Sequence, residues 1–152
     1  MKRSRLLNAE LSRAIASMGH GDLMIVCDAG FPIPPDAWRI DLALTPDLPD
    51  LEMVLSAVAE DFIAERLAYA DTLPDHNAPL LDKLRRLFPE AEHGFETHED
   101  ILGPLAGKAK CIVRSGAFDP WGNVLLYSGV DVPAWFSKPG TVAPDYYANK
   151  LK

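Results

Sequence analysis

One histidine lies in a sequence context that suits proton transfer. His20 stands between Gly19 and Gly21 and is followed by Asp22. Flanking glycines allow a sharp turn and leave the imidazole uncovered, and an imidazole of ordinary pKa, about 6.5, exchanges a proton near neutral pH. A histidine just after a helix more often caps the helix end, so the residue by itself is compatible with an acid–base role and with a structural role.

Other polar and aromatic side chains fall at predicted strand ends or in loops, where α/β proteins usually carry functional groups. Asp28 follows an apolar run, where it can hold a ligand hydroxyl, orient His20 or form a turn. His98 either contacts a ligand or lies in solvent in the first turn of a helix. In the loop before the last apolar run, Trp121 can stack on a sugar and Asn123 can hydrogen-bond to a polyol, with ordinary loop packing as the alternative for both.

Signatures of metal, nucleotide and serine-nucleophile chemistry are missing from the sequence. His93 and His98 are five residues apart, which does not place two ligands on one helical face, and neither HxxxH nor HExxH occurs. The glycine-rich phosphate loops and the GxSxG pattern are also absent. Cys27 and Cys111 lie far apart in apolar runs, so we expect two buried thiols. The sequence therefore predicts no metal and no cofactor.

Composition indicates one acidic globular domain. Of 152 residues, 48% are hydrophobic and 24% are charged, which is enough apolar material for a core. The net charge of −7 repels phosphate backbones and anionic lipid, so we expect neither nucleic acid nor membrane as a partner. No apolar stretch is long enough to span a bilayer, and Glu10 and Arg13 interrupt any signal-peptide core. We therefore expect a cytoplasmic protein.

Helices alternating with short apolar strands must position these residues. Helices are predicted over residues 9–17, 51–59 and 77–88. Strands are predicted over residues 23–27, 39–44, 111–113 and 124–127. Asn8 and Asp50 are suitable N-caps, residues 97–100 resemble a capping box, and Gly19 suits the left-handed position after the first helix. Residues 62–69 fit either a strand or a helix.

The alternation predicts the fold class. It is α/β: a single layered domain with a mostly parallel central sheet flanked by helices. The continuous apolar run at residues 23–27 is typical of a parallel strand covered on both faces.

The last segment of the chain differs from the rest. Residues 132–152 are rich in Pro, Gly, Lys and aromatics, and they show no clear period. Its aromatic residues argue against simple disorder. We expect residues 1–131 to form the α/β domain and residues 132–152 to form a C-terminal extension that packs on the domain or on a neighbouring subunit.

Several segments, in order, resemble the family of D-ribose pyranases and L-fucose mutarotases. They are Met18–Asp22, Cys27–Pro34, Arg39–Thr45, Thr97–Glu99, Val113–Gly116 and Gly122–Leu126. The resemblance covers about residues 1–131, so the α/β domain as a whole is similar to a ribose pyranase. The DAGFPIP and RID segments are closer to the ribose enzymes than to the fucose enzymes.

The resemblance implies a fold, an assembly and a chemistry. Family members have an α/β sheet fold, assemble into rings that are commonly decamers, with sites near subunit boundaries, and interconvert cyclic monosaccharides without a cofactor. His20 matches the family's proton donor. The substrate-contacting positions match Asp28, His98, Trp121, Gly122 and Asn123.

Two departures from the family pattern matter for function. Trp121 stands where the family usually has tyrosine, and an indole N–H only donates a hydrogen bond, although the ring still stacks. The second departure is the extension after Asp131.

The expected activity is interconversion of the pyranose and furanose forms of D-ribose. Alternatives are mutarotation of L-fucose or another hexose, and a non-catalytic sugar-binding subunit.

Overall fold

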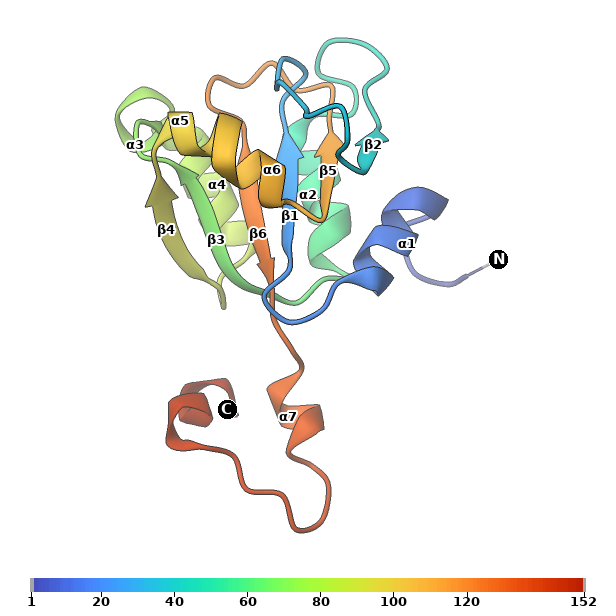
Figure 1. Cartoon of the computed structure of the whole chain (residues 1–152), viewed down its shortest axis with the longest axis vertical. Helices are drawn as coiled ribbons and strands as arrows, with labels where there is room; N and C mark the ends of the chain where they lie inside the picture. Colours follow the sequence, from blue (N-terminus) through green and yellow to red (C-terminus); the bar gives the residue numbers. More distant parts are fainter. Residues whose placement is uncertain (1, 152) are drawn as a thin grey trace.

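A six-stranded sheet forms the centre of the computed structural model, which describes residues 2–151 (Figure 1). The strand order is β2-β5-β1-β6-β3-β4. The strands are β1 Leu23–Cys27, β2 Arg39–Asp41, β3 Ala64–Ala70, β4 Glu92–Glu96, β5 Cys111–Arg114 and β6 Val124–Ser128.

Strand direction decides which loops meet. The pairs β1–β5, β2–β5 and β3–β4 are parallel, whereas β6 is antiparallel to both β1 and β3. The carboxyl ends of the five other strands and the amino end of β6 therefore lie together, at what we call the upper end of the sheet (Figure 1). The lower end holds the starts of β1 and β3 and the end of β6.

Helices cover both faces of the sheet (Figure 1). These helices are α1 Ala9–Ser17, α2 Leu51–Ala59, α3 Leu73–His76, α4 Ala78–Leu87, α5 His98–Asp100, a π-helical turn η1 Ile101–Leu105 and α6 Ala106–Lys108. The remaining two, α7 Val132–Trp135 and a 3₁₀ helix η2 Asp145–Lys150, lie in the C-terminal extension below the sheet. Because side chains alternate along a strand, Met24 and Val26 pack in the core under α1, α2 and α4. Ile25 and Cys27 pack in the core under η1 and α6.

The predicted fold class is confirmed, and so are the helix starts that were argued from caps. The Asn8 side chain accepts a hydrogen bond from the Leu11 N–H (2.9 Å), and Asp50 accepts one from the Met53 N–H (2.7 Å). The Asp100 N–H donates to Thr97 Oγ1 (3.1 Å), as expected for a cap at residue 97. Cys27 and the second cysteine are buried free thiols.

Three local expectations need correction. β4 was not predicted, because it lies at the margin of the sheet and contains no apolar run. β2 is shorter than the strand predicted over residues 39–44. The left-handed residue near the first helix is Gly21 (φ 81°) rather than Gly19, because Met18 ends the helix in an extended conformation. The ambiguous segment at residues 62–69 forms most of strand β3, which extends to Ala70.

The C-terminal extension leaves the end of β6 and lies below the lower end of the sheet (Figure 1). Val132 in α7 is buried, and the ring of Phe136 lies 5.9 Å from that of Tyr147. Lys150 in η2 contacts Glu65 at the start of β3. Within residues 2–151, no helix is both long enough and apolar enough to cross a membrane.

Candidate functional site

The upper end of the sheet brings Asp28 and Asn123 into direct contact. The Asp28 N–H donates to Asn123 Oδ1 (3.2 Å), and Asn123 is only 3% exposed. The contact forms because antiparallel β6 begins where β1 ends. Asp28 Oδ1 also accepts a hydrogen bond from the Gly30 N–H (2.7 Å), so this oxygen is used in a turn and a ligand hydroxyl would meet the other carboxylate oxygen.

Trp121 and Gly122 lie beside this contact. The Trp121 ring stacks on His76 with ring centroids 4.7 Å apart, which holds the indole against α3. His76 therefore forms a platform for the indole. A Cβ at Gly122 would lie 2.8 Å from the Asp119 carbonyl oxygen, so this close approach of backbone requires glycine.

His98 lies at the same end of the sheet but farther along it. It starts α5 directly after β4, and β3 separates β4 from β6. Two strand spacings place it roughly 10 Å from the start of β6. Its Nδ1 is buried without a hydrogen-bond partner among the described residues, as in a site completed by a ligand or by another subunit.

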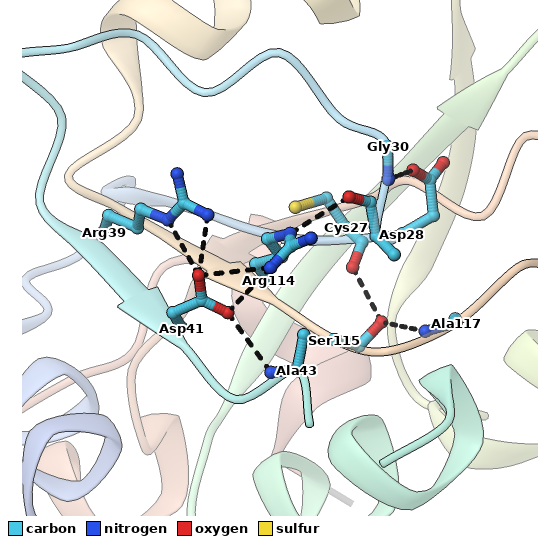
Figure 2. Close-up of polar contacts among 10 residues, drawn as sticks. Cys27, Asp28, Gly30, Arg39, Asp41, Ala43, Arg114, Ser115 and Ala117 are labelled. Atoms are coloured by element: carbon cyan, nitrogen blue, oxygen red, sulfur yellow. Dashed lines mark hydrogen bonds and ion pairs between the residues drawn. The ribbon is translucent and has the colours of Figure 1, made fainter. Parts of the chain in front are cut away.

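A charged cluster that sequence reasoning missed supports the Asp28 loop (Figure 2). Arg39 Nη2 donates to Asp41 Oδ2 (2.6 Å), and Arg114 Nη1 donates to both oxygens of Asp41 (3.2 Å each). Arg114 Nε also donates to the Ala29 carbonyl (3.0 Å), immediately after Asp28. The RID segment was the sequence signal for this cluster, but the contact with β5 depends on strand order.

A cleft of about 330 Å³ adjoins this loop, a volume suited to a small ligand. Its lining residues are Ala29, Gly30, Ala43, Leu44, Thr45, Pro46, Arg114, Gly116 and Phe118.

His20 lies at the lower end of the sheet, away from the other predicted site residues. It precedes β1 whereas Asp28 follows β1, and a five-residue strand spans roughly 17 Å. The turn is held by hydrogen bonds from the Gly21 N–H to the Ser128 carbonyl (2.7 Å) and from the Gly19 N–H to Asp22 Oδ2 (2.7 Å). Within one chain, Asp28 therefore does not orient His20.

Glu65 is the carboxylate that contacts His20. Its Oε2 lies 2.6 Å from His20 Nε2, and its Oε1 accepts a hydrogen bond from Lys150 Nζ. The hydrogen bond from Lys150, aided by His20 and opposed by partial burial, holds the pKa of Glu65 below its usual value. Neither Glu65 nor Lys150 stood out in the sequence, because they lie 45 and 130 residues from His20.

The other groups considered for metal or thiol chemistry are structural. His93 Nε2 contacts the Phe88 carbonyl (2.9 Å), and Nδ1 contacts the Tyr69 hydroxyl. Burial raises the pKa of the Cys111 thiol to about 12, which keeps it protonated and unreactive. Within the described chain, no group of three or more His, Cys, Asp or Glu side chains is arranged to hold a metal ion.

The fold and the site define a layered α/β protein with polar groups at both ends of its strands. Comparison with known proteins identifies its family. The chain belongs to the RbsD / FucU transport protein family, whose model matches residues 1–131. Two relatives and one solved structure locate it further within that family.

The chain is 54% identical to D-ribose pyranase 2 of Rubrobacter xylanophilus over 150 residues, which cover 99% of this chain and 97% of the relative. It is 42% identical to the D-ribose pyranase of Pseudomonas putida over 131 residues, covering 86% of this chain and 98% of the relative. The structure of Bacillus subtilis RbsD complexed with D-ribose matches with a TM-score of 0.81 and 34% identity, covering 86% of this chain and 98% of that one. The Rubrobacter protein therefore also matches the C-terminal extension of this chain. The Pseudomonas protein is shorter by about the length of that extension.

Proposed function

We propose that this protein interconverts the pyranose and furanose forms of D-ribose by general acid–base catalysis. The observation that carries the proposal is the similarity to a D-ribose pyranase: the two chains are 54% identical over 97% of that protein's length. The similarity to a structure complexed with D-ribose supports the same substrate class. The exposed imidazole of His20 is the group on this chain best suited to the proton transfers.

The reaction moves protons and needs no redox group. A pyranose opens when its anomeric hydroxyl loses a proton and its ring oxygen gains one, and closure by a different hydroxyl gives the furanose. A positioned imidazole that takes one proton and returns another accelerates such a step by about 10²- to 10⁴-fold. We assign this role to His20.

The other residues bind the sugar. Asp28 and His98 hydrogen-bond to its hydroxyls, Asn123 and the Gly122 backbone hold ring substituents, and Trp121 provides a stacking surface. Asn123 already fixes the backbone at residue 28, so these two positions are preorganised relative to each other.

Because β1 separates His20 from the sugar-binding residues, the proposed site requires two copies of the chain. His20 of one copy would reach the sugar held at the upper end of a neighbouring copy, in a ring-shaped homo-oligomer such as the decamer that the family resemblance implies. The unpartnered His98 Nδ1 also fits a site that one chain does not complete.

Magnetisation-exchange NMR of ribose tests the activity. The wild-type protein is expected to accelerate exchange between ring forms, and His20→Ala is expected to return the rate to that of buffer. Lys138→Ala, an exposed change on the extension, serves as a control that keeps the wild-type rate. Equal rates for the wild type and His20→Ala would refute the proposed role.

Co-expression tests the two-copy site. His20→Ala and Asn123→Ala are each expected to be inactive, and mixed oligomers should regain about a quarter of wild-type activity because some interfaces combine two intact halves. Asn123→Ala mixed with Asp28→Ala should regain none, since both changes lie in the same half. Failure of the first pair to complement would contradict the composite site.

Non-catalytic sugar binding is a second candidate, and it is favoured by Trp121. The indole is held on His76 as a stacking platform, and it lacks the hydroxyl usual at this position in the family. Saturable sugar binding without accelerated exchange would select this function. Exchange measured across a panel of sugars would separate a D-ribose pyranase from a mutarotase for L-fucose or another hexose.

A further inference from the structure

The carboxylate of Glu65 joins His20 to the C-terminal extension. One oxygen lies 2.6 Å from His20 Nε2, and the other accepts a hydrogen bond from Lys150. All three side chains are partly exposed, at 43% for His20, 32% for Glu65 and 41% for Lys150. The proposed sugar chemistry involves neither Glu65 nor Lys150.

This arrangement determines which nitrogen of His20 faces the substrate. An ionised carboxylate only accepts hydrogen bonds, so Nε2 must carry the hydrogen, and the neutral ring presents the lone pair of Nδ1. The turn around His20 is itself fixed, because Gly21 donates to the Ser128 carbonyl and Lys110 pairs with Asp22 at 2.5 Å. The remaining freedom is rotation of the ring, and the contact with Glu65 restricts it.

We propose that Glu65 is the positioning residue for His20 and that the C-terminal extension holds Glu65 in place through Lys150. The catalytic consequence rests on the proposed function, whereas the orientation of the ring does not. Lys150 occupies the second oxygen of Glu65, so it restricts the carboxylate to the rotamer that faces His20.

The extension makes this contact across a cleft. A space of about 440 Å³ lies between the extension and the sheet, and its lining includes Glu65, Val132 and Lys150. Ion pairs between partly exposed groups are screened by solvent, so Lys150 should have only a modest effect on the catalytic rate and should not be essential for activity. The D-ribose pyranase of Pseudomonas putida is shorter than this chain by about the length of the extension, which agrees with a modest effect of Lys150.

A double-mutant cycle tests the chain of contacts. Glu65→Met is expected to lower kcat for ring exchange by about 10-fold with little change in KM, and Glu65→Asp should retain more of kcat than Glu65→Met does. Lys150→Met should lower kcat by about 2-fold in the wild-type background and have no further effect beside Glu65→Met, because its influence passes through Glu65. Glu90→Met and Lys138→Met are the matched controls and should leave kcat unchanged.

NMR of the ¹⁵N-histidine-labelled protein gives a readout that does not depend on activity. When the ring is neutral, His20 of the wild type should carry its hydrogen on Nε2, and Glu65→Met should shift it toward the mixture of tautomers of free imidazole. The His20→Ala spectrum assigns the signal. An unchanged tautomer in Glu65→Met, or additive kcat effects of the two changes, would overturn the inference. A wild type that does not accelerate exchange but shows this tautomer response would refute the function and leave the positioning role standing.

Discussion

At the scale of single residues, Trp121 and Gly122 are fixed by two different steric constraints. Trp121 has a φ of 57°, in the left-handed region that bulky residues rarely occupy, and the stacked ring of His76 accompanies this conformation. At Gly122, an added Cβ would lie only 2.8 Å from the carbonyl oxygen of Asp119. The loop before β6 therefore has one conformation that presents the indole and Asn123 together.

The absent tyrosine hydroxyl leads to a prediction about rate. Trp121→Tyr should raise the ring-exchange rate by roughly 10-fold, because a phenol hydroxyl both donates and accepts a hydrogen bond and can exchange its proton, whereas an indole N–H only donates a hydrogen bond. Magnetisation-exchange NMR would measure the gain. Trp121→Phe provides the control, since it keeps an aromatic ring without the hydroxyl. Equal rates in all three proteins would mean that stacking alone is required.

The close approach at Gly122 leads to a prediction about stability. Gly122→Ala should lower the free energy of unfolding by about 1–3 kcal/mol, because the added Cβ meets backbone that must shift. Urea denaturation would measure the loss. Gly107→Ala, in α6 with open space around its Cβ, should cause no loss. A Gly122→Ala protein as stable as the wild type would contradict the constraint.

At the scale of elements, the cluster of Arg39, Asp41 and Arg114 joins β2 and β5 to the loop that carries Asp28. Partial burial acts to raise the pKa of Asp41, but hydrogen bonds from Arg39, Ala43 and Arg114 outweigh it and hold this pKa below its usual value. Because the folded-state pKa is depressed, the cluster contributes stability above the ordinary carboxylate pKa of about 4. That stability is lost as the pH falls through the lower folded-state value.

This linkage predicts a pH-dependent effect of Asp41→Asn. The variant should be less stable than the wild type at pH 7, by about 1 kcal/mol or less because the pair is partly exposed to solvent. The difference should close as the pH falls below about 4. Urea denaturation across a pH series would follow it, with Asp82→Asn on the exposed side of α4 as the control. A difference that stays constant down to low pH would show that Asp41 acts through packing instead.

At the scale of the whole molecule, the proposed site residues lie at two opposite ends of the sheet. His20 lies at the lower end, and the residues that we propose to bind the sugar lie at the upper end. Leu44 (76% exposed) and Phe118 (65% exposed) line the cleft at the upper end, and large apolar side chains that are this exposed often mark a contact surface. A second copy of the chain is the partner that we propose for this surface.

Association of copies is therefore expected in solution. Light scattering at micromolar protein should give a multiple of the 16.7 kDa chain mass. Leu44→Asp should shift the protein toward smaller species and lower the exchange rate together, because the site needs two copies. Val142→Asp, at an even more exposed position on the extension, should do neither. A monomeric wild type that still accelerates exchange would rule out the composite site.

The sequence by itself determined the local elements. Caps at Asn8 and Asp50 and the apolar run of β1 are short-range signals, so they could be identified without a structure. The expectation that Asp28 can orient His20 was wrong, because the extended strand β1 places the two residues at opposite ends of the sheet.

Only the tertiary structure decided which distant residues meet. Antiparallel β6 brings Asn123 to Asp28, and the start of β3 brings Glu65 to His20 across 45 residues of sequence. β4 could not be predicted, since a strand at the margin of the sheet needs little apolar surface. The physical reason is that caps and periodicity depend on neighbouring residues, whereas strand order depends on how all the elements pack together.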